Sequence, residues 1–120
     1  MALGFRNLAA VWQNYRDAGA RCLIIPSLLD SDDQAELRKA VPGADIYVVR
    51  LVAPLAVNHD RIRGREISAD SLRWHLQRSQ FLHQKLAEQP LEHTTVDTEG
   101  RLPDALAREV ITRWGILQRR

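Results

Sequence analysis

The stretch ADIYVVRLVAP, residues 44–54, carries the strongest indication of fold class in this chain. Its central part, Ile46–Val52, is apolar apart from Arg50. A continuous apolar run of this length predicts a strand that is buried on both faces of a parallel sheet. Ala53 and Pro54 follow it as a turn, because proline cannot donate a hydrogen bond to a sheet ladder.

Two further short strands are predicted, one before this stretch in the sequence and one after it. Cys22–Ile25 is an apolar run that ends at Pro26, and His93–Val96 runs into a turn over residues 97–100. Cys22 is the single cysteine, so it cannot form an internal disulfide, and we expect a small buried core residue there.

The remaining segments show apolar residues at helical spacing, with capping residues at their ends. Ser31 with Gln34 fits a capping box, Pro103 suits the first position of a helix, and Gly19 and Gly115 suit left-handed stops. Helices are expected over Phe5–Ala18, over Asp32–Ala40, over a polar segment after Pro54, from Ser68 or Asp70 to Gln89, and from Pro103 to Trp114.

The resulting order, α-β-α-β-α-α-β-α, is typical of a parallel sheet covered by helices. We therefore expect an α/β fold with a small parallel sheet of about three strands, in a single domain over residues 1–120. Trp12, Trp74 and Trp114 lie at or near apolar helix faces, which favours core positions over a stacking platform for bases.

Composition narrows the class of partner. The 120 residues are 45% apolar and 27% charged, as in ordinary globular proteins. Seventeen basic residues nearly balance fifteen acidic ones, for a net charge of +2, which makes a nucleic-acid binder the weakest interpretation. No apolar run approaches the roughly 18 residues of a membrane span, so we expect no membrane partner and a cytoplasmic protein.

Three arginines alternate in the run DRIRGRE, residues 60–66. On a helix Arg61 and Arg65 share a face while Arg63 points elsewhere; in a loop relaxed by Gly64, all three could converge on one anion. Arginine suits bidentate phosphate contact and the stabilisation of charge in phosphoryl transfer. A solvated helix face is the alternative interpretation.

The turn VDTEGR, residues 96–101, directly follows the last predicted strand. Ligands of open α/β sheets bind beyond the carboxyl ends of the strands, so this turn is a candidate binding segment. An ordinary Asx turn at Asp97 is the alternative. The four histidines show no metal-ligand spacing, and no metal site is predicted: His59, His75, His83 and His93.

These segments together resemble the C-terminal half of small bacterial P-loop kinase-like proteins of the adenylylsulfate-kinase and gluconate- or shikimate-kinase type. Residues 7–25, NLAAVWQNYRDAGARCLII, are similar to the family's helix and third strand, and residues 44–54 to its fourth strand. The run DRIRGRE is similar to the lid, placed at about 54–70. Residues 96–115, VDTEGRLPDALAREVITRWG, are similar to the fifth strand, the base-contacting turn and the last helix.

The resemblance implies roles for individual residues. Arg61 and Arg65 would be lid arginines that approach the phosphates. Ser27 would face the acceptor substrate. The residues beside the adenine would be Asp97, Thr98, Gly100 and Arg101.

The chain departs from the family in one large respect. The sequence contains no G-x-x-x-x-G-K-[ST], and therefore no phosphate-loop lysine and no Mg²⁺-binding Ser or Thr. The first strand is missing as well, and in the resembled fold it lies between the third and fourth. We expect that Cys22–Ile25 and Ile46–Val52 either pair directly or leave a gap that another chain fills.

The leading functional expectation is therefore the C-terminal portion of an ATP-dependent kinase-like protein that phosphorylates a small molecule. ATP and Mg²⁺ would act only if the missing half were supplied, and the chain should not be catalytic alone. The alternative is a non-catalytic interaction module, or an oligomerising remnant of the fold, that binds a second copy or a partner chain at its open sheet edge.

Overall fold

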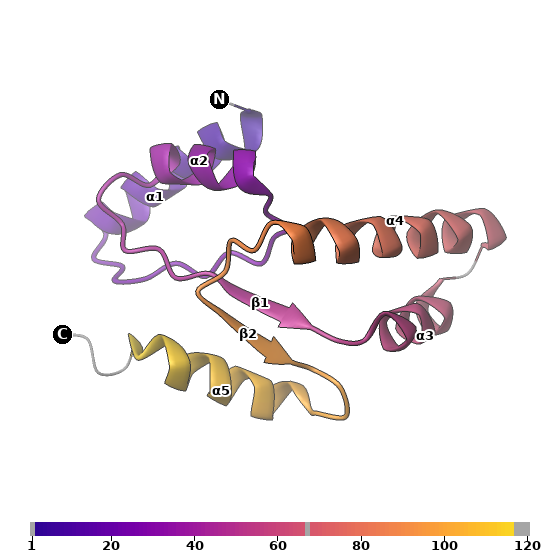
Figure 1. The fold of residues 1–120 in the computed structure, drawn as a ribbon. Coiled ribbons are helices and arrows are strands. Elements are labelled where there is room, and N and C mark those ends of the chain that lie inside the picture. Colours follow the sequence, from indigo (N-terminus) through magenta and orange to yellow (C-terminus); the bar gives the residue numbers. More distant parts are fainter. Residues whose placement is uncertain (1, 67, 117–120) are drawn as a thin grey trace. The chain divides into compact units, whose positions relative to one another are not determined.

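The computed structural model describes residues 2–66 and 68–116 of the chain. They form an α/β structure that is mostly helical (Figure 1) and that divides into two compact units, Met1–Ile46 and Tyr47–Arg120. The predicted fold class is thus confirmed at this coarse level, with two parallel strands among the described residues in place of about three.

The first unit contains two helices that pack on one another, α1 over Leu3–Asp17 and α2 over Ser31–Ala40. Gly19 ends the first helical segment with a φ of 95°, as its position in the sequence predicted. The capping box of α2 differs from the expected one. The Asp30 side chain accepts from the Asp33 amide at 2.9 Å, and Asp33 accepts from the Asp30 amide at 3.2 Å.

The predicted strand Cys22–Ile25 is wrong, because residues 20–30 have no regular secondary structure. An isolated strand leaves its backbone groups unpaired, and the described part of the first unit holds no second strand for it. Of the two alternatives for this segment, direct pairing with Ile46–Val52 requires a strand that residues 22–25 do not form. Cys22 is exposed, not buried, and Ile24 is 75% exposed.

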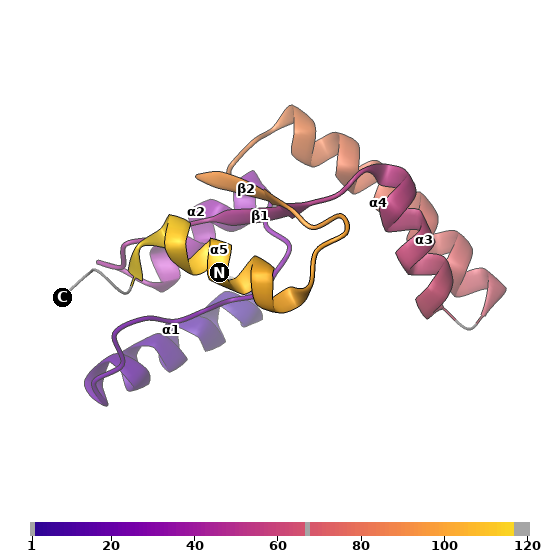
Figure 2. The ribbon, with the colours of Figure 1, turned by 90° about the horizontal axis from the view of Figure 1, so that it is seen from below.

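The second unit holds the sheet, in which β1, Val49–Val52, pairs in parallel with β2, Thr94–Asp97 (Figure 1). The register places Val49 opposite Thr94 and Val52 opposite Asp97. Parallel strands cannot be joined by a hairpin, and the connection here is a pair of helices. These are α3, Leu55–Arg65, and α4, Ala69–Glu88, which pack side by side (Figure 2).

The last helix, α5, spans Pro103–Trp114 and packs against β2. Pro103 occupies its first turn, and Gly115 ends it in the left-handed conformation with a φ of 69°, as predicted. Ser68 caps α4 by accepting from the Ser71 amide at 3.1 Å. Local sequence features therefore predicted the start of α4 and both ends of α5.

The core of the second unit includes a residue of β2 and the residue directly after β1. Val96 on β2 is fully buried and Ala53 is 7% exposed. Arg50 interrupts the apolar run without an energetic conflict, because its guanidinium donates to the Leu86 carbonyl at 2.9 Å and lies 3.6 Å from the Glu92 carboxylate. Trp74 is 59% exposed, so its predicted core position is wrong. Among the described residues, no helix has the length and apolar character needed to cross a bilayer.

The burial of Val96 makes a direct prediction about stability. Val96→Ala should lower the free energy of unfolding by about 2 kcal/mol, because it removes buried methyl groups and leaves a cavity. Thr95→Ala, at the adjacent exposed position of the same strand, should cost roughly 1 kcal/mol or less. Urea unfolding followed by circular dichroism measures both, and equal losses would contradict this placement of the core.

Candidate functional site

An open hollow lies at the carboxyl ends of the two strands, where α3 begins and the turn after β2 leads into α5. This is the side of a parallel sheet at which ligands of α/β proteins bind. The hollow is lined by polar Asn58, Arg61, Thr98 and Arg101 and by apolar Leu51, Val52, Pro103 and Leu106.

Thr98 closes the sheet at this end of the hollow. Its amide donates to the Val52 carbonyl at 2.8 Å, and its hydroxyl donates to the same carbonyl at 3.1 Å. The residue is 9% exposed, so both bonds are shielded from water. Thr98 thereby joins the last residue of β1 to the start of the turn after β2.

Arg61 reaches the hollow from α3 and bonds to the same threonine. Its two terminal nitrogens donate to the Thr98 hydroxyl at 2.8 Å and to the Thr98 carbonyl at 3.1 Å. Arg61 and Thr98 were predicted as site residues from two separate motifs. They lie 37 positions apart in the sequence and are in direct contact in the structure. Among the described residues no carboxylate pairs with Arg61, so its positive charge faces the hollow uncompensated.

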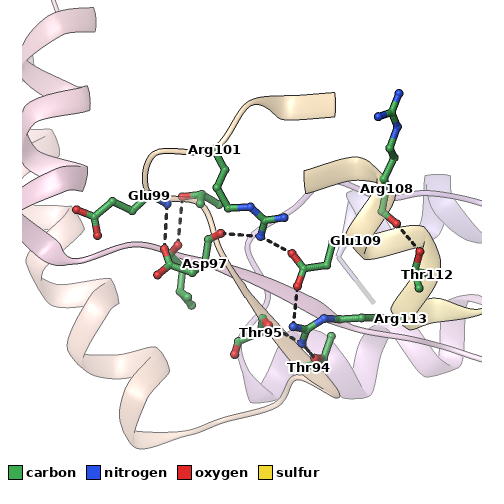
Figure 3. A network of polar contacts seen from close by, with 11 residues as sticks. Thr94, Thr95, Asp97, Glu99, Arg101, Arg108, Glu109, Thr112 and Arg113 are labelled. Atoms are coloured by element: carbon green, nitrogen blue, oxygen red, sulfur yellow. Dashed lines mark hydrogen bonds and ion pairs between the residues drawn. The ribbon is translucent and has the colours of Figure 1, made fainter. Parts of the chain in front are cut away.

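The turn itself has the geometry of the alternative interpretation, an Asx turn. The Asp97 carboxylate accepts from the Glu99 amide at 2.9 Å (Figure 3), and Gly100 has a φ of 66°, which an L side chain rarely adopts. Because its side chain completes this turn, Asp97 shapes the segment that carries Thr98 and Arg101.

Arg101 belongs to a charged network that ties the turn to α5 (Figure 3). Its guanidinium donates to the Asp97 carbonyl at 3.3 Å and pairs with Glu109. Arg113 bonds to the other oxygen of that carboxylate at 2.7 Å and to the Thr94 hydroxyl at 2.8 Å. The hydrogen bonds from Arg101 and then from Arg113 lower the pKa of Glu109 below its ordinary value.

The three arginines of the DRIRGRE run do not converge. The run lies in helix α3 up to Arg65, not in a loop around Gly64. Arg63 pairs with Asp60 at 3.1 Å and Arg65 lies 3.5 Å from Glu66, while both side chains stay largely exposed. Arg61 alone of the three lines the hollow, and the convergence expected for a loop is wrong.

Ser27 lies in the other unit, so its predicted place on the substrate side stays a prediction. Its hydroxyl donates to the neighbouring Leu28 carbonyl at 3.4 Å. Asn58 is a lining residue that the sequence analysis missed. Its position three residues before Arg61, on the same face of α3, was the signal that could have found it.

In the part of the chain that the structure describes, no three His, Cys, Asp or Glu side chains are grouped so that they could hold a metal ion. Comparisons of this chain with protein-family models, with curated proteins and with solved structures found no match.

The position of Glu109 between two arginines predicts a pH-dependent contribution to stability. Because the folded-state pKa is lowered, the contribution is complete above the pKa of the unfolded chain and is lost as the pH falls through the folded-state pKa. Glu109→Gln should therefore lower the urea midpoint at neutral pH, and its difference from the wild type should shrink on acidification.

The matched control is Glu99→Gln, which removes an exposed carboxylate that has no side-chain partner among the described residues. Its urea midpoint should follow the wild type at neutral pH. A Glu109→Gln difference that stays constant with pH would show that the ionised carboxylate does not hold α5 to the turn.

Proposed function

We propose that this chain is the C-terminal portion of a P-loop kinase-like protein and that its hollow binds a nucleotide. In this proposal the chain supplies the base side and one phosphate-facing arginine, and it does not transfer a phosphoryl group alone. The observation that carries the proposal is the meeting of Arg61 with Thr98 beside Arg101, at the carboxyl ends of two parallel strands.

The hollow has two chemically different sides, which suits a nucleotide. Leu51, Pro103 and Leu106 offer apolar contact for a flat base, and the Arg101 guanidinium can lie against such a base. The Arg101 guanidinium is paired with Glu109, a carboxylate that Arg113 shares, and this pairing reduces its attraction for a phosphate. Arg61 has no carboxylate partner among the described residues and is left to meet the anionic end.

The same arrangement argues against catalysis by the chain alone. To stabilise a transferred phosphoryl group as a lid arginine, Arg61 would have to release its two bonds to Thr98. Mg²⁺ prefers oxygen ligands, usually including a carboxylate, and the residues that line the hollow carry none. The loop lysine and the metal-binding Ser or Thr are also missing from the sequence, so these residues do not fit a complete Mg-ATP centre.

The irregular conformation of Cys22–Ile25 agrees with this proposal. In the resembled fold the corresponding strand pairs with the first strand, which this sequence lacks. The predicted fourth strand loses the same neighbour but keeps the fifth strand beside it, and these two pair as β1 and β2.

A binding series tests the proposal. Isothermal titration of the purified chain with ATP, AMP and adenosine should give an affinity that falls as phosphates are removed. Arg61→Ala should weaken ATP binding by roughly tenfold, the loss expected for one charge-assisted hydrogen bond, and should leave adenosine binding nearly unchanged.

The matched control is Arg63→Ala, which removes the same charge from the same helix at an exposed position outside the hollow. It should bind ATP as the wild type does. Absence of ATP binding at millimolar concentration, or equal losses in the two variants, would remove the nucleotide site. ATP hydrolysis by the chain alone would overturn the non-catalytic part.

An interaction module is the second candidate, favoured by the free edge of β1. The Val48 carbonyl accepts from the amides of His93 and Thr94, and the Val52 carbonyl accepts from the Thr98 amide. The alternation of a parallel ladder therefore turns the amides of Val49 and Leu51 to the other edge. Within the described residues β1 pairs with β2 alone, and the Leu51 side chain is 59% exposed. Such an edge is a template for another strand, and we propose that a second copy or a partner chain occupies it.

Sedimentation equilibrium tests the second candidate with a second copy as the partner. A dimer at micromolar concentration should be weakened roughly tenfold or more by Leu51→Lys, because an edge lysine opposes strand addition. Leu102→Lys, at a residue that is 75% exposed and lies outside the sheet, should leave the dimer unchanged. A wild-type monomer at all concentrations would exclude self-association through this edge.

A further inference from the structure

Helix α4 carries a row of alternating aromatic and cationic side chains: Trp74, Arg78, Phe81 and Lys85. We call these four residues the α4 stripe. Trp74 is 59% exposed and Phe81 is 52% exposed. The Arg78 guanidinium lies 5.1 Å from the centre of the Phe81 ring, and the Lys85 ammonium lies 6.0 Å from it. The cations therefore sit on the same face of the helix as the exposed ring.

The spacing of the stripe is that of a helix–helix seam. Its members are separated by four, three and four residues, which places them in one line along a helix and matches the a and d positions of a heptad. The half-buried positions of α4 include Leu72, Leu76 and Leu82, which lie on other heptad positions. The stripe is thus a second contact line on a helix that already packs against α3.

The charged residues of α4 between its flanking Asp70 and Glu88 are all basic, and Glu66 lies 3.1 Å from His75 of this helix. Between Ser71 and Ala87 the helix contains no Asp or Glu, and it contains two arginines, one lysine and two histidines. An aromatic seam with cations at alternate positions disfavours a second copy in parallel register, because Arg78 and Lys85 would face the same cations. A helix with acidic residues at those positions would meet both cations and cover both rings.

We propose that the α4 stripe is a docking surface for an acidic amphipathic helix of another protein. The partner helix presents apolar side chains toward Trp74 and Phe81 and carboxylates toward Arg78 and Lys85. This inference does not depend on nucleotide binding, because none of the four residues lines the hollow.

The probe is a synthetic peptide about three heptads long, with leucine and glutamate alternating at four- and three-residue spacing, and with a fluorescent label. Fluorescence anisotropy with the full chain should show saturable binding that weakens with salt. Arg78→Glu should weaken binding at least roughly tenfold, since it replaces attraction by repulsion at the centre of the stripe. Phe81→Ala should weaken it by a comparable factor through the lost ring contact.

The matched control is Arg73→Glu, the same charge reversal on an exposed residue of the same helix outside the stripe. The fold-loss of peptide affinity in Arg73→Glu should be smaller than that in Arg78→Glu by roughly a factor of five or more. Circular dichroism verifies that each variant is folded, and Arg78→Gln replaces Arg78→Glu if the latter is not.

Four results would overturn the proposal. The first is no binding of the peptide by the wild type, and the second is equal binding of a scrambled peptide of the same composition. The third is equal loss in Arg73→Glu and Arg78→Glu. The fourth is stripe-dependent binding to anionic lipid vesicles or to single-stranded DNA that exceeds peptide binding, since it would assign the stripe to a membrane or a nucleic acid.

Discussion

The carbonyl of Val52 is the point on which the second unit depends. It accepts from both the amide and the hydroxyl of Thr98, at the end where β1 and β2 would otherwise separate. Arg61 then binds the hydroxyl and the carbonyl of the same threonine, so the crossover helix α3 is attached to the sheet at this place. A short parallel pair has little stability of its own, and these buried bonds supply part of what the pair lacks.

The charges around the hollow follow from the attachment of α5. Glu109 bonds to Arg101 and Arg113 together, and Arg113 continues to Thr94 on β2. Two arginines share this single carboxylate, and Arg61 on α3 has no carboxylate partner among the described residues. Arg101 is therefore held by a carboxylate of α5, whereas Arg61 is held by the hydroxyl and the carbonyl of Thr98.

The second unit also has two exposed surfaces, one on the sheet and one on α4. The outer edge of β1 has no strand beside it among the described residues, and the aromatic rings of α4 lie at the surface. The two surfaces differ in chemistry, since one offers backbone amides and the other offers rings and cations. The partners proposed for them differ accordingly, an added strand at β1 and an acidic helix at α4.

The sequence by itself determined which segments become helices and where several of them begin and end, because these depend on local features such as Ser68, Pro103 and Gly115. It also located β1 and β2 and the two arginine-bearing motifs of the site. It did not predict the irregular conformation of Cys22–Ile25, because an apolar run becomes a strand only when another strand pairs with it. The tertiary structure alone decided that Arg61 meets Thr98 while Arg63 and Arg65 stay outside, since only the packing of α3 against the ends of the strands selects one arginine from three.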